Sequence, residues 1–193
     1  MKTWLDKLKN DNKKQEYYLT DIVSLAVKDE IAIHGHKSKI WEESMGINDK
    51  SELAKAERLL QKKLANQHME AGLTLMDPSR IDIRGSLKHG QDVSVDVNVV
   101  FEGKVELGNN VTIGPNTYVS DSSIGDNTTI HANSHISDAS IGSDSEIGPF
   151  ARIRPGADLK NNVKIGNFVE IKKSVIDDFS KVSHLTYIGD ATV

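Results

Sequence analysis

The sequence has no cysteine, and aromatic side chains make up only 5% of its 193 residues. Without cysteine the chain can form neither disulfides nor thiolate metal sites. No apolar run approaches the roughly 20 residues that cross a bilayer, and the start lacks the apolar segment of a secretory signal. The net charge of −4 gives no electrostatic reason to expect nucleic acid as a partner. We therefore expect a cytoplasmic protein that binds neither nucleic acid nor membrane.

An aliphatic residue recurs every six residues through the C-terminal part of the chain, with three steps of five. The series is Leu107, Ile113, Val119, Ile124, Ile130, Ile136, Ile141, Ile147, Ile153, Leu159, Ile165, Ile171, Ile176, Val182 and Ile188. A step of six fits neither a helix nor an alternating hairpin sheet. It fits short strands joined by sharp corners, three to a coil, in coils that stack in parallel about 4.8 Å apart. We predict a parallel β-solenoid from about residue 81 onward, with the glycines that follow many of these residues relieving the corner backbone.

The first 80 residues follow a different pattern. Asp49 and Glu52 form a capping box that predicts the start of a helix, and Gly72 predicts its end. Its apolar face, at helical spacing, consists of Leu53, Ala56, Leu60, Leu64 and Met69. Ahead of it we expect two helices and a strand, at Thr3–Leu8, Leu19–Val27 and Glu30–His34. These elements are too few to close a core, and they suggest the end of a larger domain.

The register of the repeat places Arg154 and Lys172 one above the other. The residues that precede them, Ile153 and Ile171, lie 18 positions apart and so occupy equivalent corners of successive coils. Stacked cations repel each other unless an anion lies between or beside them. The pair is either a phosphate-binding site, with arginine as a fork and lysine as a point charge, or a solvated pair softened by Glu170. The residues alone leave both interpretations open.

The next coil brings His184 and Tyr187 beside this pair, because a 17-residue step stacks Tyr187 on Glu170. A histidine can act as a general base near neutral pH, although a surface histidine without a role is the plain alternative. His131 and His135 show a spacing that binds zinc on a helix. Within one repeat of a solenoid that spacing loses its meaning, and we expect both to be solvated.

Five motifs in order along the chain resemble one bacterial family closely. They are EYYLTD at 16–21, DPSRIDIRG at 77–85, IGPFARIRPGA at 147–157, GNFVEIKK at 166–173 and SHLTYIGD at 183–190. The family is the bifunctional N-acetylglucosamine-1-phosphate uridyltransferase/glucosamine-1-phosphate N-acetyltransferase. The resemblance covers essentially the whole chain, and an ordered run of motifs is far more specific than a six-residue repeat alone.

This resemblance implies a left-handed β-helix assembled as a homotrimer. It implies acetyl transfer from acetyl-CoA to glucosamine-1-phosphate, then uridylyl transfer from UTP, giving UDP-N-acetylglucosamine for peptidoglycan and lipopolysaccharide precursors. By motif match, His184 is the general base, Arg154 and Lys172 bind the sugar phosphate, and Tyr187 is a further substrate contact. Asn48 matches a ligand of Mg²⁺ and of the UDP-sugar at the uridyltransferase site.

The resemblance also implies a division of the chain and some departures from the family. Residues 1–48 correspond to the end of the nucleotidyltransferase domain, 49–72 to a linker helix, and 77–193 to a shortened acetyltransferase β-helix. The family's glycine-rich nucleotide loop, with its lysine and aspartate, has no counterpart here, and neither do its last coils. Lys13, Lys14 and Gln15 depart from the family's small-residue loop. We expect this chain alone to catalyse neither reaction well.

Two other functions stay open at this point. The solenoid could be a non-catalytic trimerisation scaffold, or it could belong to a different, metal-dependent enzyme of the same fold that uses interface histidines. The metal-dependent reading is the weaker one, because the solenoid histidines are not spaced to converge on one face.

Overall fold

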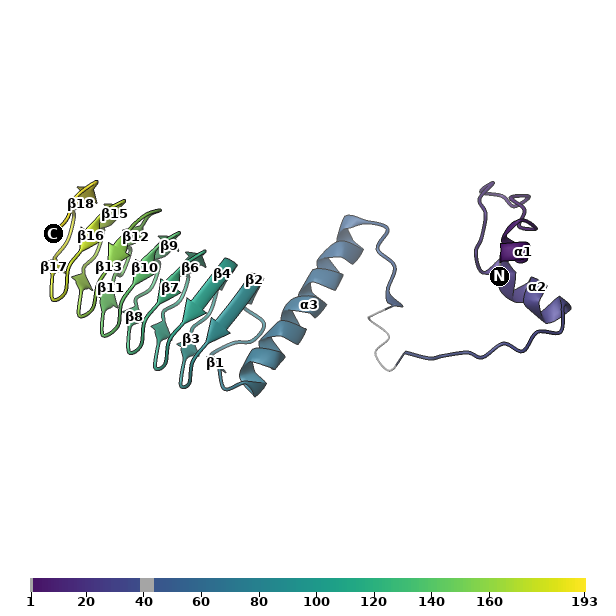
Figure 1. Ribbon diagram of the computed structural model, residues 1–193, viewed down its shortest axis with the longest axis horizontal. Coiled ribbons are helices and arrows are strands. Elements are labelled where there is room, and N and C mark those ends of the chain that lie inside the picture. The colour runs from purple at the N-terminus through teal and green to yellow at the C-terminus, as the bar shows by residue number, and fades with distance from the viewer. Residues whose placement is uncertain (1, 39–43) are drawn as a thin grey trace. The chain divides into compact units, whose positions relative to one another are not determined.

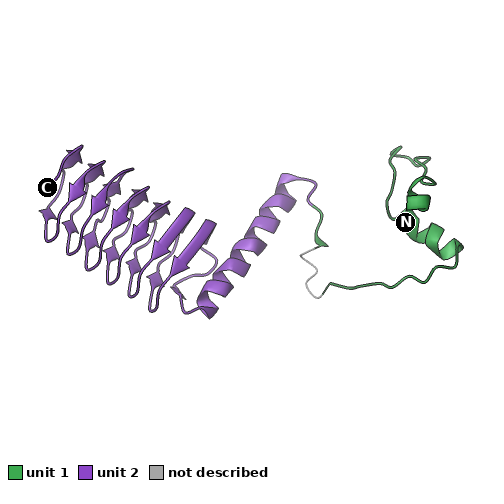
Figure 2. Ribbon diagram, viewed as in Figure 1, with its two compact units in different colours: residues 1–46 green, residues 47–193 purple. Residues whose placement is uncertain are grey.

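The structure is a computed structural model that describes residues 2–38 and 44–193, and it divides into two compact units, 1–46 and 47–193 (Figure 2). The first unit holds helices α1 (Lys2–Leu5) and α2 (Asp21–Lys28). Its described core is small, with Ile22 and Ala26 buried on α2. The indole nitrogen of Trp4 donates a 2.7 Å hydrogen bond to the carboxylate of Asp29.

The strand predicted at Glu30–His34 is wrong. Residues 31–38 form neither strand nor helix, and Ile31 and Ile33 are exposed. Ile31 and Ile33 alternate with other residues as in a strand, but no other strand lies among the described residues of this unit. A single strand without a partner leaves its backbone hydrogen bonds unmade, so local β propensity alone does not form one.

The predicted long helix is confirmed as α3 (Lys50–Glu70). The Asp49 carboxylate accepts a 2.8 Å hydrogen bond from the backbone N–H of Glu52, as a capping residue does. The chain leaves the helix at Gly72, whose φ of 102° is a left-handed conformation that glycine adopts without strain.

Beyond α3, the second unit is a parallel β-helix of stacked coils (Figure 1), which confirms the predicted fold class. Face 1 is a 7-stranded parallel sheet. Its strands are β1 (Thr74–Leu75), β3 (Ser94–Val95), β5 (Thr112–Ile113), β8 (Thr129–Ile130), β11 (Glu146–Ile147), β14 (Lys164–Ile165) and β17 (Lys181–Val182). The left-handed sense of the coil stays a prediction of the family resemblance.

The other two faces begin on two long strands, β2 (Ile81–His89) and β4 (Val99–Leu107), which turn from one face into the next. Face 2 continues with β6 (Tyr118–Ser120), β9 (His135–Ser137), β12 (Arg152–Ile153), β15 (Glu170–Lys172) and β18 (Tyr187–Gly189). Face 3 continues with β7 (Ser123–Ile124), β10 (Ser140–Ile141), β13 (Asp158–Leu159) and β16 (Val175–Ile176). The strand pairs advance by 17 or 18 residues, as the repeat predicts.

The repeated aliphatic residues form the core. All of them from Leu107 to Val182 are buried, and Ile188 packs against them. Burying side chains of this size stabilises each coil by about 1.5–3 kcal/mol per residue. His89, at the end of β2, lies with its ring 5.3 Å from that of His68 on α3.

The glycines that follow the aliphatic residues do not provide the corner conformation. Of these glycines, only Gly148 has a left-handed φ. At Gly108, Gly114, Gly125, Gly142 and Gly166 glycine is needed because the next coil passes too close for a side chain. A Cβ on Gly142 would lie 2.6 Å from the carbonyl carbon of Lys160, and one on Gly114 would lie 2.8 Å from the backbone nitrogen of Ala132. Most of these glycines are therefore required by the close approach of the next coil, and not, as predicted, by the backbone conformation of the corner.

At two of the three corners, the left-handed conformation falls instead on the third residue after the aliphatic one. At the corner between faces 1 and 2, which we call corner A, these residues are Asn98, Asn116, Asn133, Phe150, Phe168 and Leu185, with φ between 49° and 59°. Asparagine adopts this conformation readily, whereas phenylalanine and leucine do so at a cost of about 1 kcal/mol. Corner A therefore changes in character along the β-helix.

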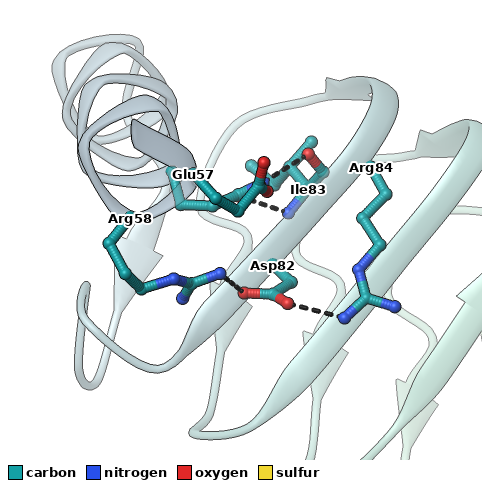
Figure 3. Close-up of polar contacts among 6 residues, drawn as sticks. Glu57, Arg58, Asp82, Ile83 and Arg84 are labelled. Atoms are coloured by element: carbon teal, nitrogen blue, oxygen red, sulfur yellow. Dashed lines mark hydrogen bonds and ion pairs between the residues drawn. The ribbon is translucent and has the colours of Figure 1, made fainter. Parts of the chain in front are cut away.

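Helix α3 covers the free edge of the first coil through a polar side chain. Gln61 is 3% exposed, and its amide accepts from the Ile83 N–H at 2.7 Å and donates to the Ile83 carbonyl at 3.0 Å. Figure 3 shows the neighbouring ion pairs, in which Asp82 joins Arg58 of α3 to Arg84 at 2.6 and 2.7 Å. Gln61 thus makes the hydrogen bonds that a neighbouring strand would make.

The buried face of α3 differs from the predicted one. Leu53 and Leu60 are about half exposed, while Gln61 and Ala65 are buried. Of the predicted face, Leu64 packs against the core, whereas Leu53 and Leu60 do not. The solenoid edge offers backbone polar groups, which a glutamine satisfies and a leucine cannot.

Candidate functional site

The predicted phosphate pair lies on the outer side of face 2. Ile153 and Ile171 are register partners on β12 and β15, so Arg154 and Lys172, which follow them, lie one strand spacing apart. The backbone N–H of Arg154 donates to the carbonyl of Ile171 at 2.8 Å, which fixes this alignment. Both side chains are partly exposed. The stacking predicted from the sequence is confirmed.

The guanidinium of Arg154 is already paired with a carboxylate. Nη1 of Arg154 donates to Oε1 of Glu170 at 2.7 Å, with both side chains about one-third exposed. The sequence suggested that Glu170 reduces the repulsion between the two cations. The structure shows that Glu170 does so by pairing with Arg154. Among the described residues, Lys172 has no ion pair. Of the predicted pair, Arg154 is therefore neutralised and Lys172 is free.

The next coil brings the other two predicted residues to the same region. Tyr187 begins β18 directly opposite Glu170 and is 60% exposed. His184 is exposed in the turn before β18, and its carbonyl accepts a 2.8 Å hydrogen bond from the hydroxyl of Thr186. Face 2 and corner A thus gather an arginine, a lysine, a tyrosine and a histidine on three successive coils.

Face 2 carries further polar groups that the sequence analysis did not single out. Arg152 is the register partner of Glu170, and His135 is the register partner of Arg152 on the preceding coil. The His135 ring lies 4.6 Å from that of Tyr118, and burial, followed by the charge of Arg152, lowers the pKa of His135. The register of the repeat could have identified Arg152 and His135, because these residues occupy the same column as Glu170 and Tyr187.

His131 and His135 do not form a metal pair. Nε2 of His131 lies 2.9 Å from Oε1 of Glu146, which Lys164 also contacts at 2.6 Å, whereas His135 faces Tyr118. Among residues 2–38 and 44–193, no three histidine, cysteine or acidic side chains converge to hold a metal.

The predicted Asn48 is not brought together with the other site residues. Its backbone N–H donates to Oε2 of Glu52 at 2.7 Å and its side-chain amide donates at 3.2 Å, and these bonds lower the pKa of Glu52. The side chain therefore completes the cap of α3.

A separate surface hollow has a volume of about 660 Å³. It follows face 3 and is lined by Lys104, Glu106, Asp121, Ser122, Ser123, Asp138, Ala139, Ser140, Gly156, Ala157 and Asp158. None of the predicted site residues contributes to it. We place the candidate site on the open face 2, which carries the two cations and Tyr187, with His184 at the adjoining corner A.

The fold and this face define the class of the protein as a parallel β-helix of six-residue repeats with a cationic outer face. The chain belongs to the family of the GMPPB C-terminal domain, whose family model matches residues 83–184, more than half of the chain. Among the part of the chain that the structure describes, no helix has the length and apolar character to cross a bilayer.

Curated relatives confirm the resemblance to the bifunctional family that the motifs predicted. The chain is 52% identical over 190 residues to the bifunctional protein GlmU of Chromobacterium violaceum, covering 98% of this chain and 42% of that protein. It is 49% identical over 193 residues to the bifunctional protein GlmU of an Azoarcus species, covering 100% and 43%. The chain thus spans less than half the length of these relatives.

Solved structures of similar shape are more distant. The acetyltransferase domain of PglB from Neisseria gonorrhoeae superposes with a TM-score of 0.47 at 19% identity, covering 65% of this chain and 62% of that one. PerB from Caulobacter crescentus, solved with CoA and GDP-perosamine, gives the same TM-score and identity, covering 66% and 61%.

Proposed function

We propose that the late coils of this β-helix form part of an acetyltransferase site for glucosamine-1-phosphate, with acetyl-CoA as the donor. Arg154 and Lys172 bind the sugar phosphate, His184 is the general base, and Tyr187 contacts the substrate. The observation that carries the proposal is the aligned stacking of Arg154 on Lys172, with His184 and Tyr187 on the adjoining coil. The similarity to GlmU proteins over the whole chain supports the choice of substrate.

The chemistry assigns one role to each group. The arginine fork and the lysine ammonium hold the phosphate dianion through charge-assisted hydrogen bonds, which fixes the sugar. The imidazole of His184 takes a proton from the 2-amino group of the sugar as the amino nitrogen attacks the thioester carbonyl. The new C–N bond forms as the C–S bond breaks, and the sulfur leaves as the thiolate of CoA. His184 then returns its proton to solvent.

Binding of glucosamine-1-phosphate, measured by isothermal titration calorimetry, tests the proposal. We expect Arg154→Ala and Lys172→Ala each to weaken binding at least about tenfold, because each removes a charge-assisted hydrogen bond. Lys181→Ala is the matched control, since it removes a cation from face 1. Equal binding by wild type and by both face 2 variants would contradict the proposal and favour the scaffold alternative.

The described residues do not fit the Mg²⁺ of the uridyltransferase reaction. Magnesium takes several oxygen ligands, and Asn48 offers one amide oxygen while its amide nitrogen bonds Glu52. No group of three histidine, cysteine or acidic side chains that could hold a metal lies among the described residues. We therefore assign no step of uridylyl transfer from UTP to these residues, and our proposal concerns the acetyl transfer half of the family's activity.

We also propose that the chain assembles as a homotrimer. The support is an exposed apolar ridge at corner A, where Phe150 and Phe168 stack with ring centroids 5.1 Å apart at 47% and 54% exposure, followed by the exposed Leu185. Apolar ridges of this kind are typical of contacts between protein chains. A mass near three times 21.3 kDa in analytical ultracentrifugation is expected, and a monomer at all concentrations would contradict assembly.

A further inference from the structure

Face 2 carries a third cation that the proposed substrate contacts leave without a role. Arg152 begins β12 two residues before Arg154, and Ile153 between them points into the core. Because side chains alternate along a strand, Arg152 and Arg154 project from the same outer face. Arg152 is exposed, and among the described residues it forms no ion pair.

Glu170 stands between these two arginines. Its register partner on β12 is Arg152, yet its carboxylate bonds Nη1 of Arg154 at 2.7 Å. Side chains directly opposite on neighbouring strands have Cβ atoms about 5 Å apart, so a glutamate in this position reaches either guanidinium. The residue opposite Glu170 on the other side is Tyr187, which brings a hydroxyl group but no charge.

A phosphate arriving at Arg154 meets this carboxylate. If Glu170 stayed in place, it would compete for the guanidinium and repel the phosphate dianion at close range. If it swung out without a partner, an ion pair would be lost. Rotation onto Arg152 avoids both costs, because the glutamate remains paired while Arg154 becomes free.

We propose that Arg152 is a positioning residue that receives the Glu170 carboxylate when a sugar phosphate binds Arg154. This inference rests on the proposed function. The site then holds two states with the same number of ion pairs, Glu170–Arg154 without the ligand and Glu170–Arg152 with it. The carboxylate prevents smaller anions from occupying Arg154 freely, and Arg152 removes the penalty for the correct ligand.

The proposal predicts a specific pattern of binding constants for glucosamine-1-phosphate. Arg152→Ala weakens binding about fivefold, the equivalent of one exposed ion pair, because Glu170 has no second partner. Glu170→Gln binds at least as tightly as wild type, because the competing charge is gone. In the double variant, Glu170→Gln restores the affinity that Arg152→Ala removes. Arg152→Lys keeps most of the affinity, since a point charge still receives a carboxylate.

Calorimetric titration of the whole chain with glucosamine-1-phosphate measures all of these variants, with Lys181→Ala as the charge-matched control on face 1. Rescue in the double variant is the readout that a merely structural role of Arg152 would not produce. Unchanged binding by Arg152→Ala, or a double variant as weak as Arg152→Ala, overturns the exchange.

The failure of the exchange is distinguishable from the failure of the proposed function. If Arg154→Ala abolishes binding and Arg152→Ala does not weaken it, the phosphate site stands and only the exchange is wrong. If the wild-type chain does not bind the sugar phosphate, or Arg154→Ala leaves binding intact, both are wrong.

Discussion

The early and late coils of this β-helix share a backbone conformation but differ in the side chains at their corners. Corner A is built of Asn98, Asn116 and Asn133 in the early coils and of Phe150, Phe168 and Leu185 in the late ones. The side-chain amide of Asn98 donates to that of Asn116 at 2.9 Å, so a polar contact joins the first two of these corners. The late corners present stacked apolar rings in the same left-handed conformation.

This difference shows where the sequence follows the needs of the fold and where it departs from them. Asparagine suits a left-handed residue, while phenylalanine holds that conformation at some cost and gains nothing from solvent exposure. The departures fall on the coils that carry Arg154, Lys172 and His184. Local rules are commonly broken at functional sites, and the aromatic corners mark this region independently of its charges.

The largest expected effect tests the early end of the comparison. Gln61→Leu should destabilise the protein by about 3 kcal/mol, because it leaves the buried N–H and carbonyl of Ile83 without partners. Urea unfolding gives the total, and hydrogen exchange should show the loss concentrated in the first coils rather than around Arg154.

Gln67→Leu is the matched control for this change, since Gln67 is an exposed residue of the same helix. It should alter stability by no more than about 0.5 kcal/mol. Equal losses in the two variants would show that α3 does not close the coil edge through Gln61.

A smaller effect separates the two kinds of corner. Asn116→Phe should destabilise the β-helix by about 1 kcal/mol, because it forces a bulky residue into the left-handed conformation and breaks the bond to Asn98. The reverse change, Phe168→Asn, relieves similar strain but loses the stacking on Phe150, worth about 1 kcal/mol, so stability should change little.

Thermal and urea unfolding of the two corner variants measure this asymmetry. A loss above about 2 kcal/mol for Phe168→Asn would contradict the balance of strain against stacking, and would mean that Phe168 packs against more than its neighbouring ring. A neutral Asn116→Phe would show that the corner does not discriminate between side chains.

The sequence by itself determined the β-helix, its register and the alignment of Arg154 with Lys172. The physical reason is that each coil repeats one short pattern and contacts only its neighbours, so spacing along the chain translates directly into spacing in space. The same register contained the column of Arg152, Glu170 and Tyr187, although the residue types gave no reason to select Arg152.

Only the tertiary structure decided the features that depend on what lies opposite a residue. It showed that the Glu170 carboxylate pairs with Arg154. It also showed that Gln61 rather than Leu60 contacts the edge of the solenoid. It also left residues 31–38 without a strand. Periodicity reports which side chains are apolar, but the partner of a polar group depends on a second segment, and no local pattern records which segment that is.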